Sequence, residues 1–213
     1  MMKLYSMPGA CSLGPHIALE WSGEKYQVAM LSHADLKKPS FLALNPLGQV
    51  PVLEENDGWV LTQASAILEY IAAKFPQKKL GPEQAPREQA EFRSWLALLQ
   101  SDVHKAYSPL WAPQAFLPDS KQHDALRNAA IARVRKLMAV LDARLGGQEH
   151  PFGQRRTVVD AQLYVFLRWT DKMAGGLAEF TNLQRIFASM NGDQSVKRVL
   201  AAEGLVPSAA KAA

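Results

Sequence analysis

Apolar and polar positions along the chain fall into two parts with different rhythms. Between residues 1 and 80 the spacing of apolar residues changes every few positions, whereas between 84 and 203 it is that of successive helices. The segment 76–86 is rich in Pro and Gly, as linkers are. We therefore expect an α/β domain over residues 1–80 and an all-α domain over residues 87–205.

The first part combines short strands with short helices. The expected elements are a strand at 3–6, a helix at 12–21, a strand at 26–31, a short helix at 41–44, strands at 50–53 and 59–61, and a helix at 62–74. A strand, a helix and a strand at this spacing imply a right-handed crossover and a parallel pair. Asn56-Asp57-Gly58 is a strong hairpin signal between the last two strands. This order of elements is that of a thioredoxin-like domain.

The second part is predicted to be a helical bundle. Its expected helices span residues 87–107, 122–145, 158–173, 181–190 and 195–202. Thr157 and Asp160 have the spacing of a capping box in which Asp replaces the usual Glu, so one helix should begin there.

The composition is that of a folded protein with a single thiol. Of the 213 residues, 48% are hydrophobic and 21% are charged, which excludes a disordered chain. No apolar stretch approaches the ~18 residues that a membrane-spanning helix needs, so we expect no membrane partner. Because Cys11 is the single cysteine, neither an intrachain disulfide nor a cysteine-only metal cluster can form. We expect a cytoplasmic protein without a metal.

The net charge of +4 raises the question of nucleic-acid binding. The whole excess of basic residues lies beyond residue 80, where the densest cluster is Arg133, Arg135 and Lys136, near Arg127. Acidic and apolar residues interrupt this cluster, and no run of Arg and aromatic residues accompanies it. We therefore interpret it as the solvated face of a helix and expect no nucleic-acid partner.

Cys11 is the first candidate for chemistry. It follows the Pro8-Gly9 turn at the end of a strand and begins a helix, where free N–H groups and the positive helix end should lower the pKa of the thiol. The alternative is a buried structural cysteine, a common environment for this residue. Ser12-Leu13-Gly14 supplies no second cysteine, which excludes a dithiol oxidoreductase but not a mixed disulfide with an external thiol.

Two other segments offer groups to a ligand. Val50-Pro51 opens a strand after a turn, where a cis bond would expose a backbone N–H and C=O; the alternative is an ordinary trans Pro at a strand start. Thr62-Gln63-Ala64-Ser65 precedes an amphipathic helix, where N–H groups and hydroxyls can bind an anion; the alternative is simple helix capping.

Several short segments point together to one family. In the first part they are Met2-Lys3-Leu4-Tyr5, Pro8-Gly9-Ala10-Cys11-Ser12-Leu13, Pro15-His16-Ile17-Ala18-Leu19, Asn45-Pro46, Gly48-Gln49-Val50-Pro51-Val52-Leu53, Leu61-Thr62, Ala66-Ile67 and Tyr70. In the second part they are Val103-His104-Lys105-Ala106-Tyr107-Ser108-Pro109-Leu110, Thr157-Val158-Val159-Asp160-Ala161 and Ala202-Glu203-Gly204-Leu205. In this order and spacing they resemble bacterial beta-class glutathione S-transferases over residues 2–205.

The resemblance implies an N-terminal thioredoxin-like glutathione site, a C-terminal helical domain and a homodimer. By this resemblance, Cys11 meets the glutathione sulfur, and both Cys11 and His104 are catalytic. Taken alone, His104 would more often be a packed or surface histidine. The residues that the resemblance assigns to glutathione are Ser12, Lys37 or Lys38, Val50 ahead of a cis Pro51, Gln63, Ala64, Ser65, Ser101 and Lys105.

The expected activity is that of a transferase with glutathione as co-substrate and a role in detoxification. The enzyme would favour the glutathione thiolate through N–H groups and hydroxyls and present it to a small hydrophobic electrophile. Reduction of mixed disulfides through Cys11 is a second expected activity. The candidates for the apolar wall of the electrophile pocket, each with core packing as its competing role, are Met7, Tyr107, Trp111 and Trp169.

Five positions depart from the pattern of the family. Ser6 stands where an aromatic residue is usual, and Tyr5 should face the other side of its strand. Gln63 replaces an acidic residue, and Ala64 replaces a Ser or Gly. The other two departures are Leu47 in place of a Lys and Ala97 in place of an Asn. These losses of polar contacts leave open an alternative, a non-catalytic protein of the same fold that binds glutathione or a hydrophobic ligand.

Overall fold

The computed structural model describes residues 1–207 and begins with a four-stranded sheet. The strands are β1 (Met2–Ser6), β2 (Tyr26–Met30), β3 (Val52–Glu54) and β4 (Val60–Thr62). Their order across the sheet is β2-β1-β3-β4, in which β1 and β2 are parallel and the other neighbours are antiparallel. The predicted thioredoxin-like order of elements is confirmed.

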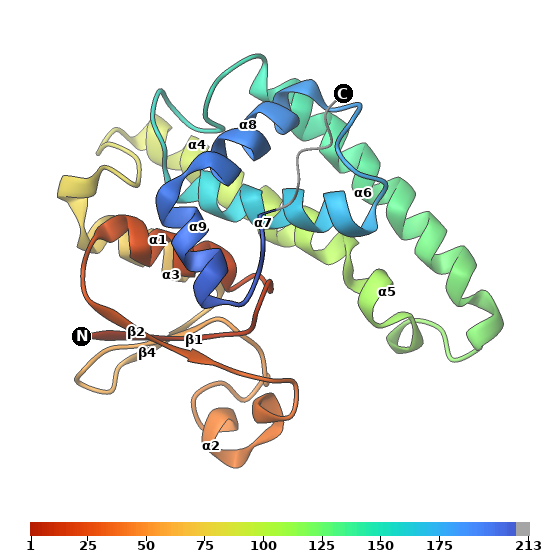
Figure 1. Ribbon diagram of the computed structural model, residues 1–213, viewed down its shortest axis with the longest axis horizontal. Coiled ribbons are helices and arrows are strands. Elements are labelled where there is room, and N and C mark those ends of the chain that lie inside the picture. The colour runs from red at the N-terminus through yellow and green to blue at the C-terminus, as the bar shows by residue number, and fades with distance from the viewer. Residues whose placement is uncertain (208–213) are drawn as a thin grey trace.

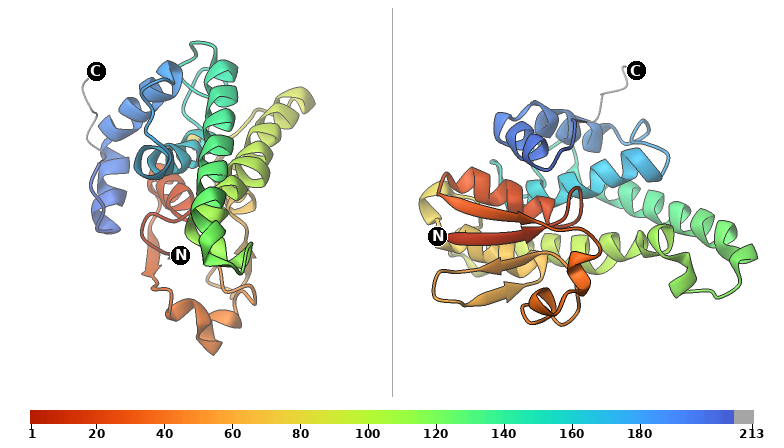
Figure 2. Two further views of the ribbon diagram at one scale, coloured as in Figure 1. Left: turned by 90° about the vertical axis from the view of Figure 1, so that its right-hand side faces the viewer. Right: turned by 60° about the horizontal axis from the view of Figure 1, so that its bottom comes forward.

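Helices cover the sheet and form the remainder of the molecule. Figure 1 shows α1 and α3 above the sheet, α2 below it, and the long α6 extending away from the strands, and Figure 2 shows the same arrangement from two other sides. The helices are α1 (Leu13–Ser22), α2 (Pro39–Leu42), α3 (Ala64–Lys74), α4 (Pro86–Ala97), α5 (Ser108–Trp111), α6 (His123–Leu145), α7 (Val158–Met173), α8 (Thr181–Gly192) and α9 (Gln194–Ala202).

Strand β1 alternates between the two faces of the sheet, as its sequence predicts. Leu4 and Ser6 are fully buried. Tyr5 points to the other face, where its hydroxyl donates to the Glu54 carboxylate at 2.7 Å. The expectation that Tyr5 lies on the side opposite Ser6 is therefore confirmed, because successive side chains of a strand point to opposite faces.

One hydrophobic core joins the sheet to the helical part. Helix α1 packs on α3, α7 and α9, so that it lies between the strands and the C-terminal helices. Helix α7 is buried along almost its whole length. Its start is capped as predicted: Thr157 Oγ1 accepts from the Val159 N–H, and the Asp160 carboxylate accepts from the Thr157 N–H at 2.8 Å.

The helix expected at 87–107 is not one continuous α-helix. It ends as α4 at Ala97 and continues as a π-helix over Leu98–His104, the π segment below. A π-helix has more residues per turn than an α-helix, but a stretch of seven residues is too short for the spacing of apolar residues to show the difference. The short α5 beyond it has Pro in its first turn and was not expected either.

Neither a membrane-spanning helix nor a cluster of metal-binding side chains is present within residues 1–207. None of their helices has the length and apolar character needed to cross a bilayer. The same residues contain no group of three or more His, Cys, Asp or Glu side chains arranged to hold a metal ion.

Candidate functional site

Cys11 and Val50, distant in sequence, meet at the end of β1. The half-buried Cys11 thiol donates to the Val50 carbonyl oxygen, with a distance of 3.4 Å from Sγ to oxygen. The Val50–Pro51 peptide bond is cis, and Pro51 is buried at the start of β3. The cis bond that the resemblance implies is thus confirmed, and the trans alternative is wrong.

The pKa of the Cys11 thiol moves in the direction opposite to the sequence prediction. Burial raises it to about 12, while the N–H groups of Cys11 and Ser12 act in the lowering sense without offsetting that effect. Helix α1 begins only at Leu13, so the thiol lies before its first turn. The expectation of a free-protein thiolate at Cys11 is wrong, because removal from water disfavours the charged form.

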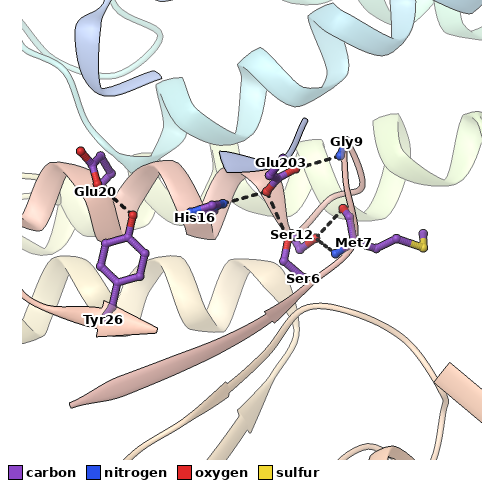
Figure 3. Close-up of polar contacts among 8 residues, drawn as sticks. All are labelled: Ser6, Met7, Gly9, Ser12, His16, Glu20, Tyr26 and Glu203. Atoms are coloured by element: carbon purple, nitrogen blue, oxygen red, sulfur yellow. Dashed lines mark hydrogen bonds and ion pairs between the residues drawn. The ribbon is translucent and has the colours of Figure 1, made fainter. Parts of the chain in front are cut away.

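The Ser12 side chain makes its hydrogen bonds inside the protein. It is fully buried, and its hydroxyl accepts from Ser6 Oγ at 2.8 Å and from the Met7 N–H at 3.2 Å (Figure 3). Both serine hydroxyls are therefore occupied next to residues 7–12, which we call the Cys11 turn. The assignment of Ser12 to glutathione stays a prediction, which the backbone N–H of Ser12 beside the Cys11 thiol would fulfil, since the hydroxyl makes its hydrogen bonds inside the protein.

A carboxylate from the C-terminal end of the chain completes this buried network. Glu203 has a fully buried side chain and accepts from the Gly9 N–H at 2.9 Å and from Ser6 Oγ at 3.3 Å. Its other contact is His16 Nδ1, at 2.8 Å (Figure 3). The sequence motif around Glu203 contributed to the family resemblance, but no spacing rule linked it to a turn almost two hundred residues away.

The N-terminus of α3 offers uncapped backbone groups. Gln63 precedes this helix and has a φ of 73°, a backbone conformation that residues other than glycine rarely adopt. No side chain caps the helix, so its first N–H groups are open to a ligand. The Gln63 side chain is exposed, Ala64 is buried and Ser65 is half-buried. Strained residues of this kind cluster at ligand-binding sites.

The two candidate lysines differ in their surroundings. Lys38 Nζ pairs with the Asp35 carboxylate at 2.7 Å. Lys37 is exposed, and within residues 1–207 it makes no ion pair. Of the two ammonium groups, Lys37 is therefore the one whose charge is available to a ligand.

The π segment and the residue that follows it hold three further candidates. Ser101 is exposed and donates to the Ala97 carbonyl at 2.8 Å and to the Asp102 carboxylate at 2.7 Å. Lys105 directly follows the π segment and is exposed. His104 is half-buried, and desolvation, assisted by the charge of Lys105, lowers the pKa of its imidazole. His104 is therefore neutral at neutral pH.

An aromatic cluster surrounds His104. The ring centroids of Trp111, Phe166 and Trp169 lie 6.0, 5.8 and 5.3 Å from that of His104. Trp111 is 44% exposed and Trp169 is 8% exposed. The Trp169 indole N–H donates to the Gly9 carbonyl at 2.8 Å, which connects this cluster to the Cys11 turn.

Tyr107 and Met7 complete the set of predicted pocket residues. Tyr107 is fully buried, and its hydroxyl contacts Thr170 Oγ1 at 2.6 Å and donates to the Phe166 carbonyl at 3.1 Å. The pocket role predicted for Tyr107 is wrong, because the side chain packs in the core, the alternative weighed from the sequence. Met7 is half-buried beside the Cys11 turn.

Comparisons with known proteins identify the family of this chain. The family model of the glutathione S-transferase N-terminal domain matches residues 1–73, and that of the glutathione S-transferase C-terminal domain matches residues 124–189. A relative from Xanthomonas campestris, glutathione S-transferase GST-4.5, is 39% identical over 96% of this chain and 100% of its own length.

Solved structures give the same result. The glutathione S-transferase of Xylella fastidiosa is 40% identical, with a TM-score of 0.91 over 97% of this chain and 100% of the other. A beta-class glutathione S-transferase from Sphingomonas chungbukensis is 36% identical, with a TM-score of 0.86 over 96% of this chain and 100% of the other. The resemblance to bacterial beta-class enzymes is confirmed. This chain belongs to the glutathione S-transferase family, a family of transferases.

Proposed function

We propose that this protein conjugates glutathione to a small hydrophobic electrophile. The observation that carries the proposal is the contact between the Cys11 thiol and the Val50 carbonyl, 3.4 Å apart beside a cis Val50–Pro51 bond. This contact brings a thiol next to the backbone of the residues that precede β3, as recognition of a thiol-containing peptide requires. A sphingomonad relative, 35% identical with a TM-score of 0.85, was solved in complex with glutathione.

The proposed site holds the tripeptide by its backbone and both of its ends. Val50 pairs with the peptide groups, and Cys11 contacts the sulfur. The uncapped first turn of α3, with Gln63, Ala64 and Ser65, receives the γ-glutamyl end, because a helix N-terminus stabilises a carboxylate. Lys37 meets the glycyl carboxylate, since Lys38 is paired with Asp35.

The electrophile lies against the aromatic cluster. Trp111, Trp169 and Met7 form its wall, while Ser101 and Lys105 border the glutathione side. His104, neutral through burial, accepts a proton from the glutathione thiol, so that the thiolate attacks the electrophile. Disulfide reduction through Cys11 is not favoured, because a thiol whose pKa is raised to about 12 is largely protonated at neutral pH.

The proposal extends to the whole protein. Residues 1–80 form the glutathione-binding domain and residues 87–205 the helical domain that supplies most of the electrophile pocket. We place the enzyme in the cytoplasm, as a homodimer with a role in detoxification. The alternative of a non-catalytic binding protein is not favoured, since the relatives are named as transferases.

Turnover and binding measured side by side test this function. Chlorodinitrobenzene conjugation gives the rate, and calorimetric titration gives glutathione affinity without an electrophile. We expect saturable binding and turnover, both reduced by Val50→Pro, which removes the peptide N–H. The matched control is Val206→Pro, at an exposed position near the end of the described chain. Binding without turnover would instead support the non-catalytic alternative.

A further inference from the structure

Among residues 1–207, Gln100 is the residue whose side chain lies within hydrogen-bond distance of the His104 ring. Gln100 Oε1 lies 3.2 Å from His104 Nδ1. Gln100 precedes His104 by four residues, and both belong to the π segment. Within residues 1–207 no hydrogen bond reaches Nε2 of His104. Three aromatic rings lie near the imidazole, and rings of this kind offer no acceptor that would select one nitrogen over the other.

This contact decides which nitrogen of a neutral imidazole carries the proton. An amide oxygen can only accept a hydrogen bond, so the nitrogen that faces it must donate. A neutral imidazole has one N–H and one lone pair. With the proton on Nδ1, the lone pair is on Nε2.

The amide of Gln100 is itself incompletely satisfied. Its Nε2 is buried and has no hydrogen-bond partner among residues 1–207. A buried unpaired amide group costs free energy, so packing alone would favour an apolar residue of similar size here. The benefit that offsets this cost is the hydrogen bond to His104.

We propose that Gln100 is a positioning residue, which holds the proton of His104 on Nδ1 and thereby leaves Nε2 as the proton acceptor for the glutathione thiol. Its catalytic part rests on the proposed function. Its structural part concerns the free protein and stands independently of any substrate.

Nitrogen NMR of the uniformly labelled protein tests the structural part. Spectra taken at about pH 8.5, where a histidine of lowered pKa is neutral, distinguish a protonated ring nitrogen from one with a lone pair. The His104→Asn variant identifies the His104 signals among those of the five histidines. We expect a protonated Nδ1 in the wild type. A proton on Nε2 would overturn the inference.

Substitutions of Gln100 give the second readout. Gln100→Leu should shift the His104 proton toward Nε2 and lower kcat for conjugation roughly five- to tenfold, the value of about one neutral hydrogen bond. Gln100→Glu keeps an acceptor oxygen and should restore the Nδ1 proton. Gln89→Leu, on α4, is the matched control and should change neither quantity.

The outcomes separate the two proposals. An unchanged proton position in Gln100→Leu overturns the role of Gln100, whatever the activity does. A moved proton with unchanged kcat upholds the effect of Gln100 on the tautomer and overturns proton acceptance by His104. A protein that fails to conjugate glutathione in the wild type contradicts the proposed function but leaves the NMR result valid.

Discussion

At the scale of single residues, burial affects the pKa of the Cys11 thiol more strongly than its position near a helix start does. Cys11 stands where sequence reasoning expects a low thiol pKa, yet desolvation raises it to about 12. The hydroxyls of Ser6 and Ser12 likewise form hydrogen bonds inside the protein. Ser6 donates to Ser12, and Ser12 accepts from the Met7 N–H. In the site that we propose, a bound thiolate is therefore stabilised mainly through backbone groups and through His104.

The raised pKa of Cys11 predicts slow alkylation. Because the reactive form is the thiolate, the rate with iodoacetamide should rise about tenfold for each pH unit from 7 to 10 without levelling off. Mass spectrometry follows the reaction directly, since Cys11 is the only cysteine. A rate that reaches a plateau below pH 9 would show that the thiol ionises far more readily than burial allows.

Replacing Gln63 should strengthen glutathione binding. A carboxylate at this exposed position can accept a charge-assisted hydrogen bond from the γ-glutamyl ammonium, whereas the amide offers only a neutral one. Gln63→Glu should therefore improve affinity by ~0.5–2 kcal/mol, a few-fold to about thirtyfold. Calorimetry measures the change, with Gln27→Glu on the far edge strand β2 as the control. Equal affinity in both variants would contradict our placement of the γ-glutamyl end.

At the scale of elements, the residue that follows α9, Glu203, is hydrogen-bonded to the turn that carries Cys11. Glu203 reaches Ser6, Gly9 and His16 from this position, and α1 packs directly on α9. Because the contacts lie far apart in sequence, neither periodicity nor capping rules could predict them. The capping box of α7 was predictable, since all of its atoms come from four consecutive residues.

Loss of the Glu203 carboxylate should destabilise the fold. Glu203→Ala leaves the buried His16 and the part-buried Gly9 N–H without their partner, so we expect the free energy of unfolding to fall by about 3–5 kcal/mol. Denaturant unfolding provides the measurement. Glu179→Ala, which breaks the exposed pair with Arg135, should cost at most ~1 kcal/mol. Equal losses in the two variants would mean that the buried network does not stabilise the fold.

At the scale of the whole molecule, the fold was more predictable than the site. Strand and helix order followed from local spacing and turn residues, and α7 was predicted over its observed range, 158–173. The π segment and the burial of Tyr107 depend on how α4 and α7 pack together, which a single sequence does not encode locally. The surroundings of several candidate site residues therefore could not be predicted from the sequence.

The proposed homodimer is a prediction at this same scale. Trp59 is 44% exposed on the hairpin side of the sheet, and its ring centroid lies 5.0 Å from that of Tyr70 on α3. Exposed aromatic surface of this kind is typical of a protein interface. Sedimentation at micromolar concentration should give twice the mass of one chain, and Trp59→Ser should weaken the association. A single species with the mass of one chain in the wild type would refute the dimer.

The most direct test of the account is a crystal structure of the protein with glutathione. We predict the glutathione sulfur within about 4 Å of Cys11 Sγ, peptide hydrogen bonds to Val50, and the γ-glutamyl carboxylate at the first N–H groups of α3. Glutathione bound elsewhere, with the Cys11 turn and the start of α3 both free of ligand, would contradict the proposed site and the mechanism built on it.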